Sequence, residues 1–238
     1  ALQHGLSGVA WMHRLPGQLG ATVRMNARCY GGEISQVVAR VHCVDWQGND
    51  YSYESTPENK TVFRGYKDTI FMENKQLITS IEVELTPGAL EEIREKMAFC
   101  AGDRLAKQQF EHPSCGCVFK NDYSPEVSLP SGLLLDAVGA KSLRLGEAEV
   151  SATHGNFIFN LGHARSQDIL RLSLQLRERV WEHFGVWLQY EMEIHGCIPE
   201  ELRNLVQEER APRYQVERLQ EARKKWQGCR PAPTCDKK

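Results

Sequence analysis

The sequence of 238 residues lacks two features that define large functional classes. It has no apolar run of the length that crosses a membrane, and no block of lysine or arginine before its C-terminal tail. The net charge is −2 and the pI is about 6.5. These properties argue against a membrane span and against a general binder of nucleic acids or membrane surfaces. The length suffices for one large domain or two modest ones with a real hydrophobic core.

The beginning of the sequence lacks an initiator methionine, and it lacks a charged segment followed by an apolar one. We therefore expect no secretory signal, and we expect these residues to be the remainder of a longer product.

Cysteine pairs at the CxxC spacing of zinc modules are also absent, although the chain has eight cysteines. They lie at positions 29, 43, 100, 115, 117, 197, 229 and 235. His112, Cys115 and Cys117 come nearest to a ligand cluster, and no fourth partner is apparent. We predict no metal site, and we favour a reducing cytoplasm with mostly buried free thiols.

The richest stretch is residues 114–121, which read Ser-Cys-Gly-Cys-Val-Phe-Lys-Asn. Two thiols flank Gly116, which lets the backbone approach a ligand closely or take a positive φ. The apolar pair after Cys117 predicts burial, so we place Cys117 where a buried strand meets a loop. Lys120 and Asn121 can donate hydrogen bonds to an anionic, oxygen-rich ligand. A small protic side chain between a glycine and such donors suits proton delivery to a substrate.

A second stretch, residues 8–33, has several glycines among small and β-branched residues. Residues 15–17 predict a turn, and the small residues after it permit close contact with a cofactor. The alternative is a pair of glycine-rich turns that bind no ligand, because glycine spacing alone is weak evidence.

Residues 63–71 gather two cations, an anion and a tyrosine around one glycine. A solvated loop is the simplest interpretation. The neighbours Tyr66, Ile70 and Phe71 nevertheless favour partial burial of Lys67, and a partly buried cation needs an anionic partner.

The remaining pattern predicts an α+β protein. Alternation predicts strands at 37–44, 51–53, 77–85, 156–160 and 186–194, with a turn at 45–49. Helical spacing predicts helices at 89–106 and 133–138, and a long amphipathic helix from a cap at Ser166 to Phe184. Residues 199–227 predict a charged helix before a frayed tail, with Trp226 as a docking point.

Four segments resemble, in order, the family of UDP-N-acetylenolpyruvoylglucosamine reductases, also called UDP-N-acetylmuramate dehydrogenases. Residues 15–33 look like its I-P-G-x-x-G-x-x-x-x-N-x-G-A-Y-G segment, which lines the flavin. Residues 65–71 are similar to its G-Y-R-x-S-I-F, and residues 113–121 to its P-S-C-G-S-V-F-K-N. Residues 131–136 and 150–160 resemble the core of its substrate domain. The resemblance runs from about residue 5 to residue 196, and it is closest to the family's compact subtype.

The resemblance implies three parts. They are the remainder of an FAD-binding α+β domain at 1–88, a smaller α+β substrate-binding domain at 89–196, and a charged C-terminal helical extension and tail at 197–238. The family's N-terminal subdomain, whose glycine-rich G-G-G-S-N loop holds the FAD pyrophosphate, is not in these residues.

It also implies an NADPH- and FAD-dependent oxidoreductase. NADPH reduces FAD, and hydride then passes to UDP-N-acetylglucosamine enolpyruvate to give UDP-N-acetylmuramate. This reaction belongs to cytoplasmic peptidoglycan synthesis, and so to cell wall biogenesis, cell shape, the cell cycle and cell division. The implied partner is this nucleotide sugar and not a nucleic acid, and we expect a monomer. Two alternatives stay open: an impaired or inactive relative that binds a nucleotide sugar or a protein partner, and a generic α+β domain whose thiols serve its core or a metal.

Hydride addition leaves a carbanion next to a carboxylate, which needs a positive neighbour and an acid. The resemblance assigns the catalytic roles to Lys67 and Glu191 at the carboxylate and to Cys117 as the proton donor. Lysine replaces the family's arginine and lacks its planar fork, whereas cysteine replaces serine and still offers a proton. The implied cofactor-binding residues are Pro16, Gly17, Gly20, Ala21, Asn26, Tyr30 and Gly31. The implied substrate-binding residues are Tyr66, Gly116, Lys120, Asn121 and His154.

Overall fold

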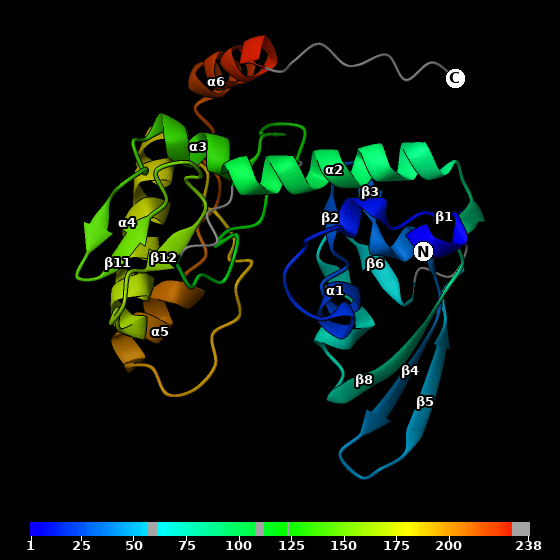
Figure 1. The fold of residues 1–238 in the computed structure, drawn as a ribbon. Helices are drawn as coiled ribbons and strands as arrows, with labels where there is room; N and C mark the ends of the chain where they lie inside the picture. Colours follow the sequence, from blue (N-terminus) through cyan, green and yellow to red (C-terminus); the bar gives the residue numbers. More distant parts are fainter. Residues whose placement is uncertain (57–60, 108–111, 123, 230–238) are drawn as a thin grey trace. The chain divides into compact units, whose positions relative to one another are not determined.

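The computed structural model describes residues 1–56, 61–107, 112–122 and 124–229. The chain divides into two compact units, Ala1–Ala106 and Lys107–Lys238 (Figure 1). The domain limits predicted at residues 88 and 196 stay predictions. The end of the predicted tail, residues 230–238 with Cys235, lies outside the described residues.

The first unit contains an antiparallel three-stranded sheet in the order β5-β4-β8. Alternation along β4 buries Val41 and Cys43, while His42 contacts Glu82 on the other face. The strands are β4 (Val38–Asp45), β5 (Asp50–Glu54) and β8 (Gln76–Val83). The strands predicted at 37–44, 51–53 and 77–85 are confirmed, as is the turn between the first two.

Short elements and one long helix complete this unit, and its core gathers Trp11, Val23, Ile34 and Phe71 around the sheet. The helix α2 (Leu90–Lys107) confirms the helix predicted at 89–106. The short elements are η1 (Leu2–His4), β1 (Leu6–Ser7), η2 (Ala10–Met12), α1 (Leu19–Arg24), β2 (Arg28–Cys29), β3 (Gly32–Glu33), η3 (Ile34–Gln36), β6 (Phe63–Gly65), β7 (Asp68–Thr69), η4 (Ile70–Met72) and β9 (Thr86–Pro87).

The second unit packs a long helix, α4, against a small antiparallel sheet in the order β10-β11-β12. Leu172, Leu176 and Val180 of α4 are fully buried in one cluster with Val150 and Ile158 of the sheet. The elements are α3 (Ser131–Ala137), β10 (Arg144–Leu145), β11 (Ala148–Val150), β12 (Ile158–Asn160), α4 (Ser166–Phe184), α5 (Glu200–Gln207) and α6 (Val216–Cys229). The predicted short helix, long helix and strand near 158 are confirmed in type and place.

The two ends of α4 differ in how well the sequence predicts them. Ser166 is the first helical residue and not the cap. The carboxylate of Asp168 instead accepts a 3.1 Å hydrogen bond from the backbone N–H of Arg165, and so caps the helix start. The helix ends at Phe184 as predicted, because Gly185 takes a φ of 67°. A Cβ at Gly185 would overlap the carbonyl oxygen of Arg213, so only glycine fits there.

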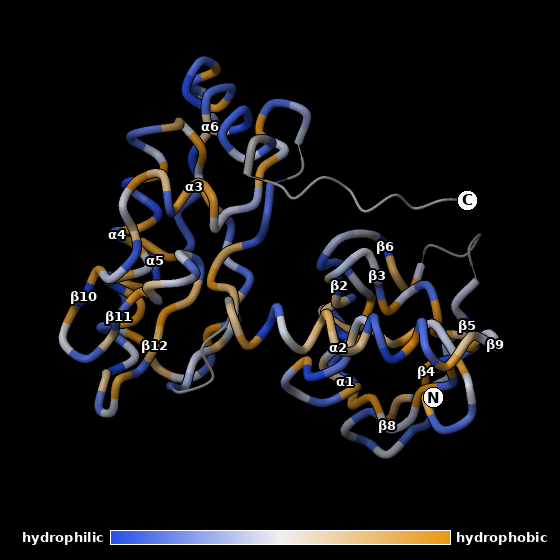
Figure 2. The backbone as a smooth tube through the Cα atoms, turned by 45° about the horizontal axis from the view of Figure 1, so that its top comes forward, coloured by the Kyte–Doolittle hydropathy of each residue, from blue (hydrophilic) through white to orange (hydrophobic). Residues whose placement is uncertain are grey.

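Two predictions for the C-terminal third are wrong. Residues 186–194 form no regular strand, because they pair through isolated contacts such as the bridge between Phe119 and Tyr190. The charged helix predicted at 199–227 is two helices, α5 and α6, separated at residues 208–215, where Pro212 cannot continue a helix. Helix α6 is mostly hydrophilic (Figure 2), and Trp226 packs, partly buried, against the core as predicted.

The prediction of mostly buried thiols is also wrong. Six cysteines fall within the described side chains, and all six are free. Cys43 and Cys100 are buried, whereas Cys115 and Cys197 are exposed because they lie in loops outside the helices and strands.

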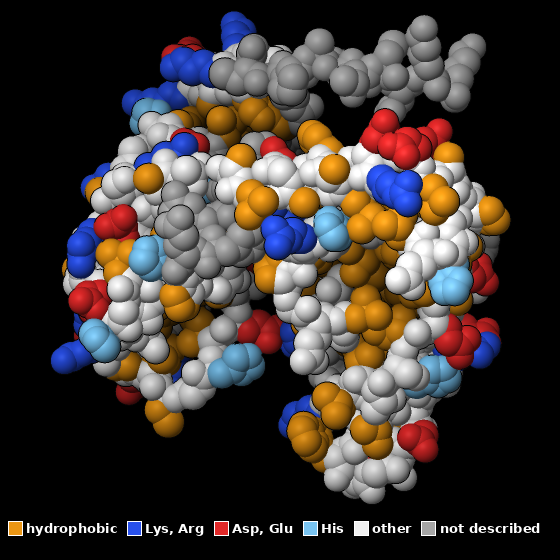
Figure 3. Space-filling model, viewed as in Figure 1, with side chains coloured by type: hydrophobic (Ala, Val, Ile, Leu, Met, Phe, Trp, Pro, Cys, Tyr) orange, Lys and Arg blue, Asp and Glu red, His pale blue; other side chains and the backbone are white. Residues whose placement is uncertain are grey.

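Large hydrophobic side chains are exposed on the first unit. They include Leu90, Phe99 and Leu105 of α2, and Trp46 and Leu77 near the β4–β5 turn. Figure 3 shows hydrophobic side chains along α2 and around the sheet. Such surfaces are often covered by a partner or a ligand. Within the described residues, no helix is long and apolar enough to cross a membrane.

Candidate functional site

Residues 114–121, which we call the central run, lie between two other segments of the second unit. On one side, Cys117 pairs with Phe157, and the N–H of Val118 donates a 2.9 Å hydrogen bond to the carbonyl of Asn156. On the other side, the N–H of Lys120 donates to the carbonyl of Gln189 at 2.8 Å. Val118 and Phe119 are fully buried, as predicted. Cys117 therefore lies where the exposed loop 114–116 enters a paired, buried segment.

Asn156 fixes this run, although sequence reasoning did not single it out as a site residue. Its side chain is 1% exposed. Its Oδ1 accepts a 2.9 Å hydrogen bond from the N–H of Phe119, and its Nδ2 donates a 2.8 Å hydrogen bond to the carbonyl of Phe119. The side-chain amide thus replaces a neighbouring strand. The available signal was a lone amide at the start of an apolar strand.

The backbone of Glu191 pairs with the residue that follows Cys117. The N–H of Glu191 donates a 2.8 Å hydrogen bond to the carbonyl of Val118, the residue after Cys117. The next residue, Met192, has its Sδ 3.9 Å from the Sγ of Cys115. Neighbouring atoms desolvate the Cys115 sulfur and raise its pKa, although the residue as a whole is exposed, and the Glu191 carboxylate raises it further. The thiol of Cys115 and the carboxylate of Glu191, from distant parts of the sequence, therefore interact in the second unit.

Three of the predicted substrate-binding residues, Gly116, Lys120 and Asn121, belong to this run, and His154 lies near the segment that pairs with it. Gly116 takes a φ of 79°, which a side chain would strain. The Oδ1 of Asn121 accepts a 3.0 Å hydrogen bond from the N–H of Ser131, and the hydroxyl of Ser131 donates to the carbonyl of Lys120. This pair ties the run to the start of α3. The ring of His154 packs on Phe157 with 4.6 Å between centroids, and its Nδ1 accepts a hydrogen bond from the N–H of Asn156.

Lys67 belongs to the first unit, at the tip of the hairpin formed by β6 and β7. Its backbone is left-handed, with a φ of 54°. Both Lys67 and Tyr66 are half-buried, which confirms the predicted partial burial of the cation. The Nζ of Lys67 lies 6.0 Å from the centre of the Tyr66 ring, and the guanidinium of Arg28 lies 4.8 Å from the same ring.

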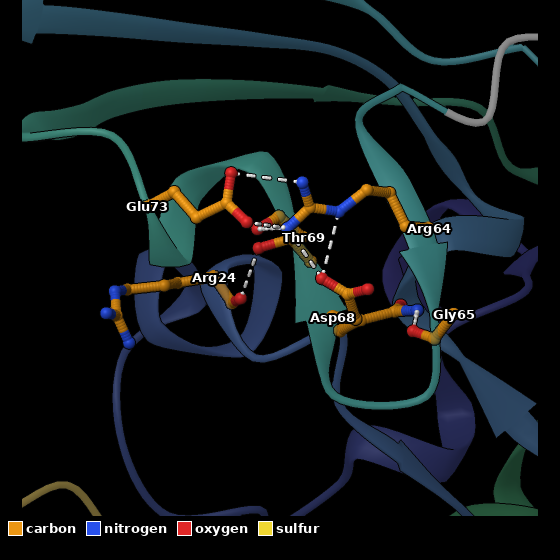
Figure 4. A network of polar contacts seen from close by, with 7 residues as sticks. Arg24, Arg64, Gly65, Asp68, Thr69 and Glu73 are labelled. Atoms are coloured by element: carbon orange, nitrogen blue, oxygen red, sulfur yellow. Dashed lines mark hydrogen bonds and ion pairs between the residues drawn. The ribbon is translucent and has the colours of Figure 1, made fainter.

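Arg64 fixes this hairpin (Figure 4). Its Nη2 lies 2.7 Å from Oδ1 of Asp68 on the opposite strand and 2.7 Å from Oε1 of Glu73 beyond it. The hydroxyl of Thr69 donates a 2.6 Å hydrogen bond to the carbonyl of Arg24, which ties the hairpin to α1. Lys67 therefore sits on a turn that is held at its base. Because the other two predicted catalytic residues lie in the second unit, their convergence with Lys67 stays a prediction.

The predicted cofactor segment takes several left-handed turns. Gly17 precedes α1 with a φ of 102°, and Tyr30 and Gly31 turn from β2 into β3 with φ of 49° and 76°. Gly20 lies in α1, where a Cβ would lie 3.8 Å from Ile78 of β8. Pro16 and Ala21 flank these positions, before and within α1. At Gly17 and Gly31 the backbone is thus open, with nothing within 4 Å of the place of a Cβ.

Asn26 is the buried polar group of this segment, at 1% exposed. Its Nδ2 donates to Glu33 at 2.6 Å and to the carbonyl of Gly65 at 2.9 Å. Its Oδ1 has no hydrogen-bond partner within the described residues. Asn26, Glu33, Phe63 and Gly65 help to line an open cavity of about 720 Å³. An unsatisfied buried carbonyl oxygen beside a cavity fits a ligand that donates a hydrogen bond.

Arg104, near the end of α2, is a second residue that sequence reasoning missed. It is 2% exposed, and it donates hydrogen bonds to the carbonyl of Trp11 at 3.1 Å and to the Sγ of Cys29 at 3.0 Å. Its guanidinium lies 4.9 Å from the centre of the Tyr30 ring. Burial raises the pKa of Tyr30, as does the hydrogen bond that its hydroxyl donates to Asp103. Tyr30 therefore ties the turn between β2 and β3 to α2.

Within the described part of the chain, no three His, Cys, Asp or Glu side chains come together in a way that could hold a metal ion. The two units and these pairings define an α+β protein whose second unit presents a thiol beside a carboxylate, and whose first unit has a left-handed, glycine-rich segment at a cavity.

Comparison with known proteins narrows this class. Residues 108–195 match the family model described as UDP-N-acetylenolpyruvoylglucosamine reductase, C-terminal domain. The chain is 38% identical over 196 residues to the UDP-N-acetylenolpyruvoylglucosamine reductase of Carboxydothermus hydrogenoformans, covering 82% of this chain and 62% of that protein. It is 34% identical over 194 residues to that of Pseudothermotoga lettingae, covering 82% and 66%. The crystal structure of the Thermus caldophilus enzyme matches with a TM-score of 0.67 and 33% identity, over 81% of this chain and 66% of that one.

The chain belongs to the UDP-N-acetylenolpyruvoylglucosamine reductase family. It spans 62% to 66% of the length of these relatives. The predicted family and the predicted α+β fold class are thereby confirmed.

Proposed function

We propose that this chain supplies the substrate-binding unit and part of the flavin site of a reductase that uses NADPH and FAD. The substrate is UDP-N-acetylglucosamine enolpyruvate and the product UDP-N-acetylmuramate, a precursor of peptidoglycan in the cytoplasm. The observation that supports the proposal is the 2.8 Å hydrogen bond from the N–H of Glu191 to the carbonyl of Val118, because it brings the backbone of Glu191 next to the run that carries Cys117. The named relatives support the assignment of the reaction.

The residues of the first unit fit the flavin. The unsatisfied Oδ1 of Asn26 can accept a hydrogen bond from an imide N–H or a ribityl hydroxyl, and both groups occur in FAD. Gly17, Gly20 and Gly31 would let the ring system approach the backbone closely. FAD, when bound, supplies the hydride that it has taken from NADPH.

The protein's own residues would handle the charge and the proton. Hydride addition to the enolpyruvyl double bond develops negative charge beside the substrate carboxylate, which the ammonium of Lys67 would stabilise. The thiol of Cys117 would then give its proton to the carbon that carries this charge. Glu191 would act with Lys67 at the carboxylate. Tyr66, Gly116, Lys120, Asn121 and His154 would hold the rest of the substrate.

A flavin spectrum tests this proposal. A version of the protein that also carries the family's N-terminal FAD subdomain is mixed with FAD, reduced with NADPH without oxygen, and then given the enolpyruvyl substrate. We expect bleaching by NADPH, and recovery of the oxidised spectrum on addition of substrate. Thermal stabilisation by the substrate without any flavin chemistry would instead identify an inactive relative that binds the nucleotide sugar. Lysine at position 67 and cysteine at 117, in place of the family's usual residues, motivate this second candidate.

A further inference from the structure

The segment that carries Glu191, residues 186–191, is held from two sides although it belongs to no regular sheet. One side pairs with the central run, as described above. On the other side lies Arg177 of α4, which is 1% exposed. Its Nε donates a 2.7 Å hydrogen bond to the carbonyl of Leu188. Its guanidinium lies 4.0 Å from the centre of the Trp187 ring and 4.9 Å from that of Tyr190.

The acceptors that complete this contact come from later in the chain. We call residues 200–215 the C-terminal arm; it follows the part matched by the family's C-terminal domain, which ends at residue 195. The Nη1 of Arg177 donates a 3.0 Å hydrogen bond to the carbonyl of Val206. The indole N–H of Trp187 donates a 2.6 Å hydrogen bond to the carbonyl of Glu208. The arm thus accepts one hydrogen bond from Arg177, which holds the segment, and one from Trp187, which belongs to it.

The arm also covers the indole with a second cation. The guanidinium of Arg210 lies 4.0 Å from the centre of the Trp187 ring, the same distance as that of Arg177. Two planar cations at that distance cannot share one face, so the indole lies between them. Arg210 is oriented by two hydrogen bonds to Glu178 of α4, at 2.7 and 2.6 Å. It is therefore held in place over Trp187.

Both ends of the arm are anchored on the second unit. Leu202 of α5 is fully buried. At the other end, the N–H of Arg213 donates to the carbonyl of Gly185 at 2.9 Å, and the N–H of Gln215 donates to the carbonyl of Phe184 at 2.8 Å. The arm therefore closes around the point where residue 186 leaves α4, and it cannot shift without moving the segment.

The buried charge of Arg177 couples the arm to the segment, because its hydrogen bonds reach both. Burial lowers the pKa of the Arg177 guanidinium, because it disfavours the charged form. A buried charge is tolerated only where carbonyl oxygens and aromatic faces replace water. Tyr190 passes the constraint on, because its ring stacks on Phe119 with 5.1 Å between centroids and its hydroxyl lies 3.0 Å from that of Ser173. Glu191 is the next residue in the chain after Tyr190.

We propose that the C-terminal arm, acting through Arg177 and Trp187, holds Glu191 in place against the run that carries Cys117. Arg177 and Trp187 are positioning residues, because they act through the segment and not on the reacting atoms. This inference rests on the proposed function for the role of Glu191. It extends that function by making the arm, which lies beyond the family's own domain, a requirement for the proton-transfer half-reaction.

Trp187→Phe and Arg177→Lys test the inference. The first keeps an aromatic ring but removes the hydrogen bond to Glu208 together with the five-membered ring of the indole. The second keeps the charge and loses the planar group that reaches Leu188 and Val206 together. Trp46→Phe, at a tryptophan that is 79% exposed in the first unit, and Arg171→Lys, at an exposed arginine of α4, are the matched controls. Urea unfolding establishes which variants fold.

Two readouts are needed. In the flavin-loaded protein, we expect at least about tenfold slower reoxidation by the enolpyruvyl substrate for both arm variants, with a changed pH profile, since misplacing groups at a reacting centre lowers the rate strongly. Flavin reduction by NADPH should be unchanged. In the chain without cofactor, we expect faster hydrogen exchange in peptides covering 117–121 and 186–192. The controls should match the wild type in both measurements.

The outcomes distinguish a failure of the proposed function from a failure of the positioning role of the arm. Wild-type flavin that is not reoxidised by the substrate contradicts the proposed function, and the catalytic role of the arm falls with it. A wild type that turns over beside folded arm variants with equal rates contradicts the inference alone. Faster hydrogen exchange with unchanged reoxidation would reduce the arm to a stabilising element and would also overturn the inference.

Discussion

Asn156 binds Phe119 through both of that residue's backbone polar groups, at 2.9 Å for the N–H and 2.8 Å for the carbonyl. Phe119 is fully buried and stands two residues after Cys117. This single amide therefore sets the path of the run from which the thiol projects. The position of the candidate acid depends on a residue that has no catalytic role of its own.

We expect Asn156→Ala to lower the free energy of unfolding by about 2 to 4 kcal/mol, because it leaves a buried N–H and a buried carbonyl without their partners. Urea unfolding, followed by circular dichroism, measures the change. Asn204→Ala, at an exposed asparagine of α5, is the control and should stay within about 0.5 kcal/mol of the wild type. Equal stability of the two variants would show that the Asn156 clamp contributes little.

Cys117→Ala should spare the reduction of flavin by NADPH and slow its reoxidation by the substrate by about a hundredfold, because only the second half-reaction needs a proton donor. Stopped-flow absorbance separates the two steps. Cys197→Ala is the matched control, since it removes an exposed thiol of the same unit that lies outside the run and should leave both steps unchanged. If reoxidation by the Cys117→Ala protein is as fast as in the wild type, Cys117 is not the acid.

The sequence predicted those parts of the site that depend on local pattern. Burial of Val118 and Phe119 follows from an apolar pair between polar residues, and partial burial of Lys67 follows from its apolar neighbours. The clamp by Asn156 could not be predicted, because it joins residues that are 37 positions apart. Nothing local identifies which lone amide will meet which backbone.

Arg177 illustrates a different limit. An arginine in a long amphipathic helix usually belongs to the solvated face, although the spacing from Leu170 and Val180 puts position 177 on the buried face. It is buried because Trp187 and the carbonyls of Leu188 and Val206 surround it, and all of these follow α4 in the chain. The same contacts explain the wrong strand at 186–194: the segment satisfies its backbone through a side chain and isolated pairings instead of a sheet.

Lys67→Arg should strengthen binding of the substrate, because a guanidinium can grip a carboxylate with two parallel hydrogen bonds and an ammonium cannot. We expect the KM for the enolpyruvyl substrate to fall about fivefold, on the order of 1 kcal/mol. The left-handed backbone at this position costs the same for both side chains, so stability should not change. Lys75→Arg, at an exposed lysine of the same unit, is the control. An unchanged or higher KM would show that residue 67 does not meet the carboxylate.

Burial raises the pKa of the Cys43 thiol from 9.0 to about 11, since the side chain lies in the core of the first unit at 1% exposed. The folded protein therefore holds this proton more tightly than the unfolded chain does. The contribution to stability is complete below pH 9 and is lost as the pH rises through about 11, because the unfolded thiol ionises first.

We expect Cys43→Ala to be less stable than the wild type at neutral pH, and the difference in free energy of unfolding to shrink between pH 9 and pH 11. Urea unfolding at several pH values across this window measures it, and taking the difference between the two proteins cancels the other groups that titrate there. Cys197→Ala, at an exposed thiol, should follow the wild type throughout. A stability difference that stays constant or grows with pH would mean that Cys43 can ionise in the folded state without penalty, and that its surroundings admit water.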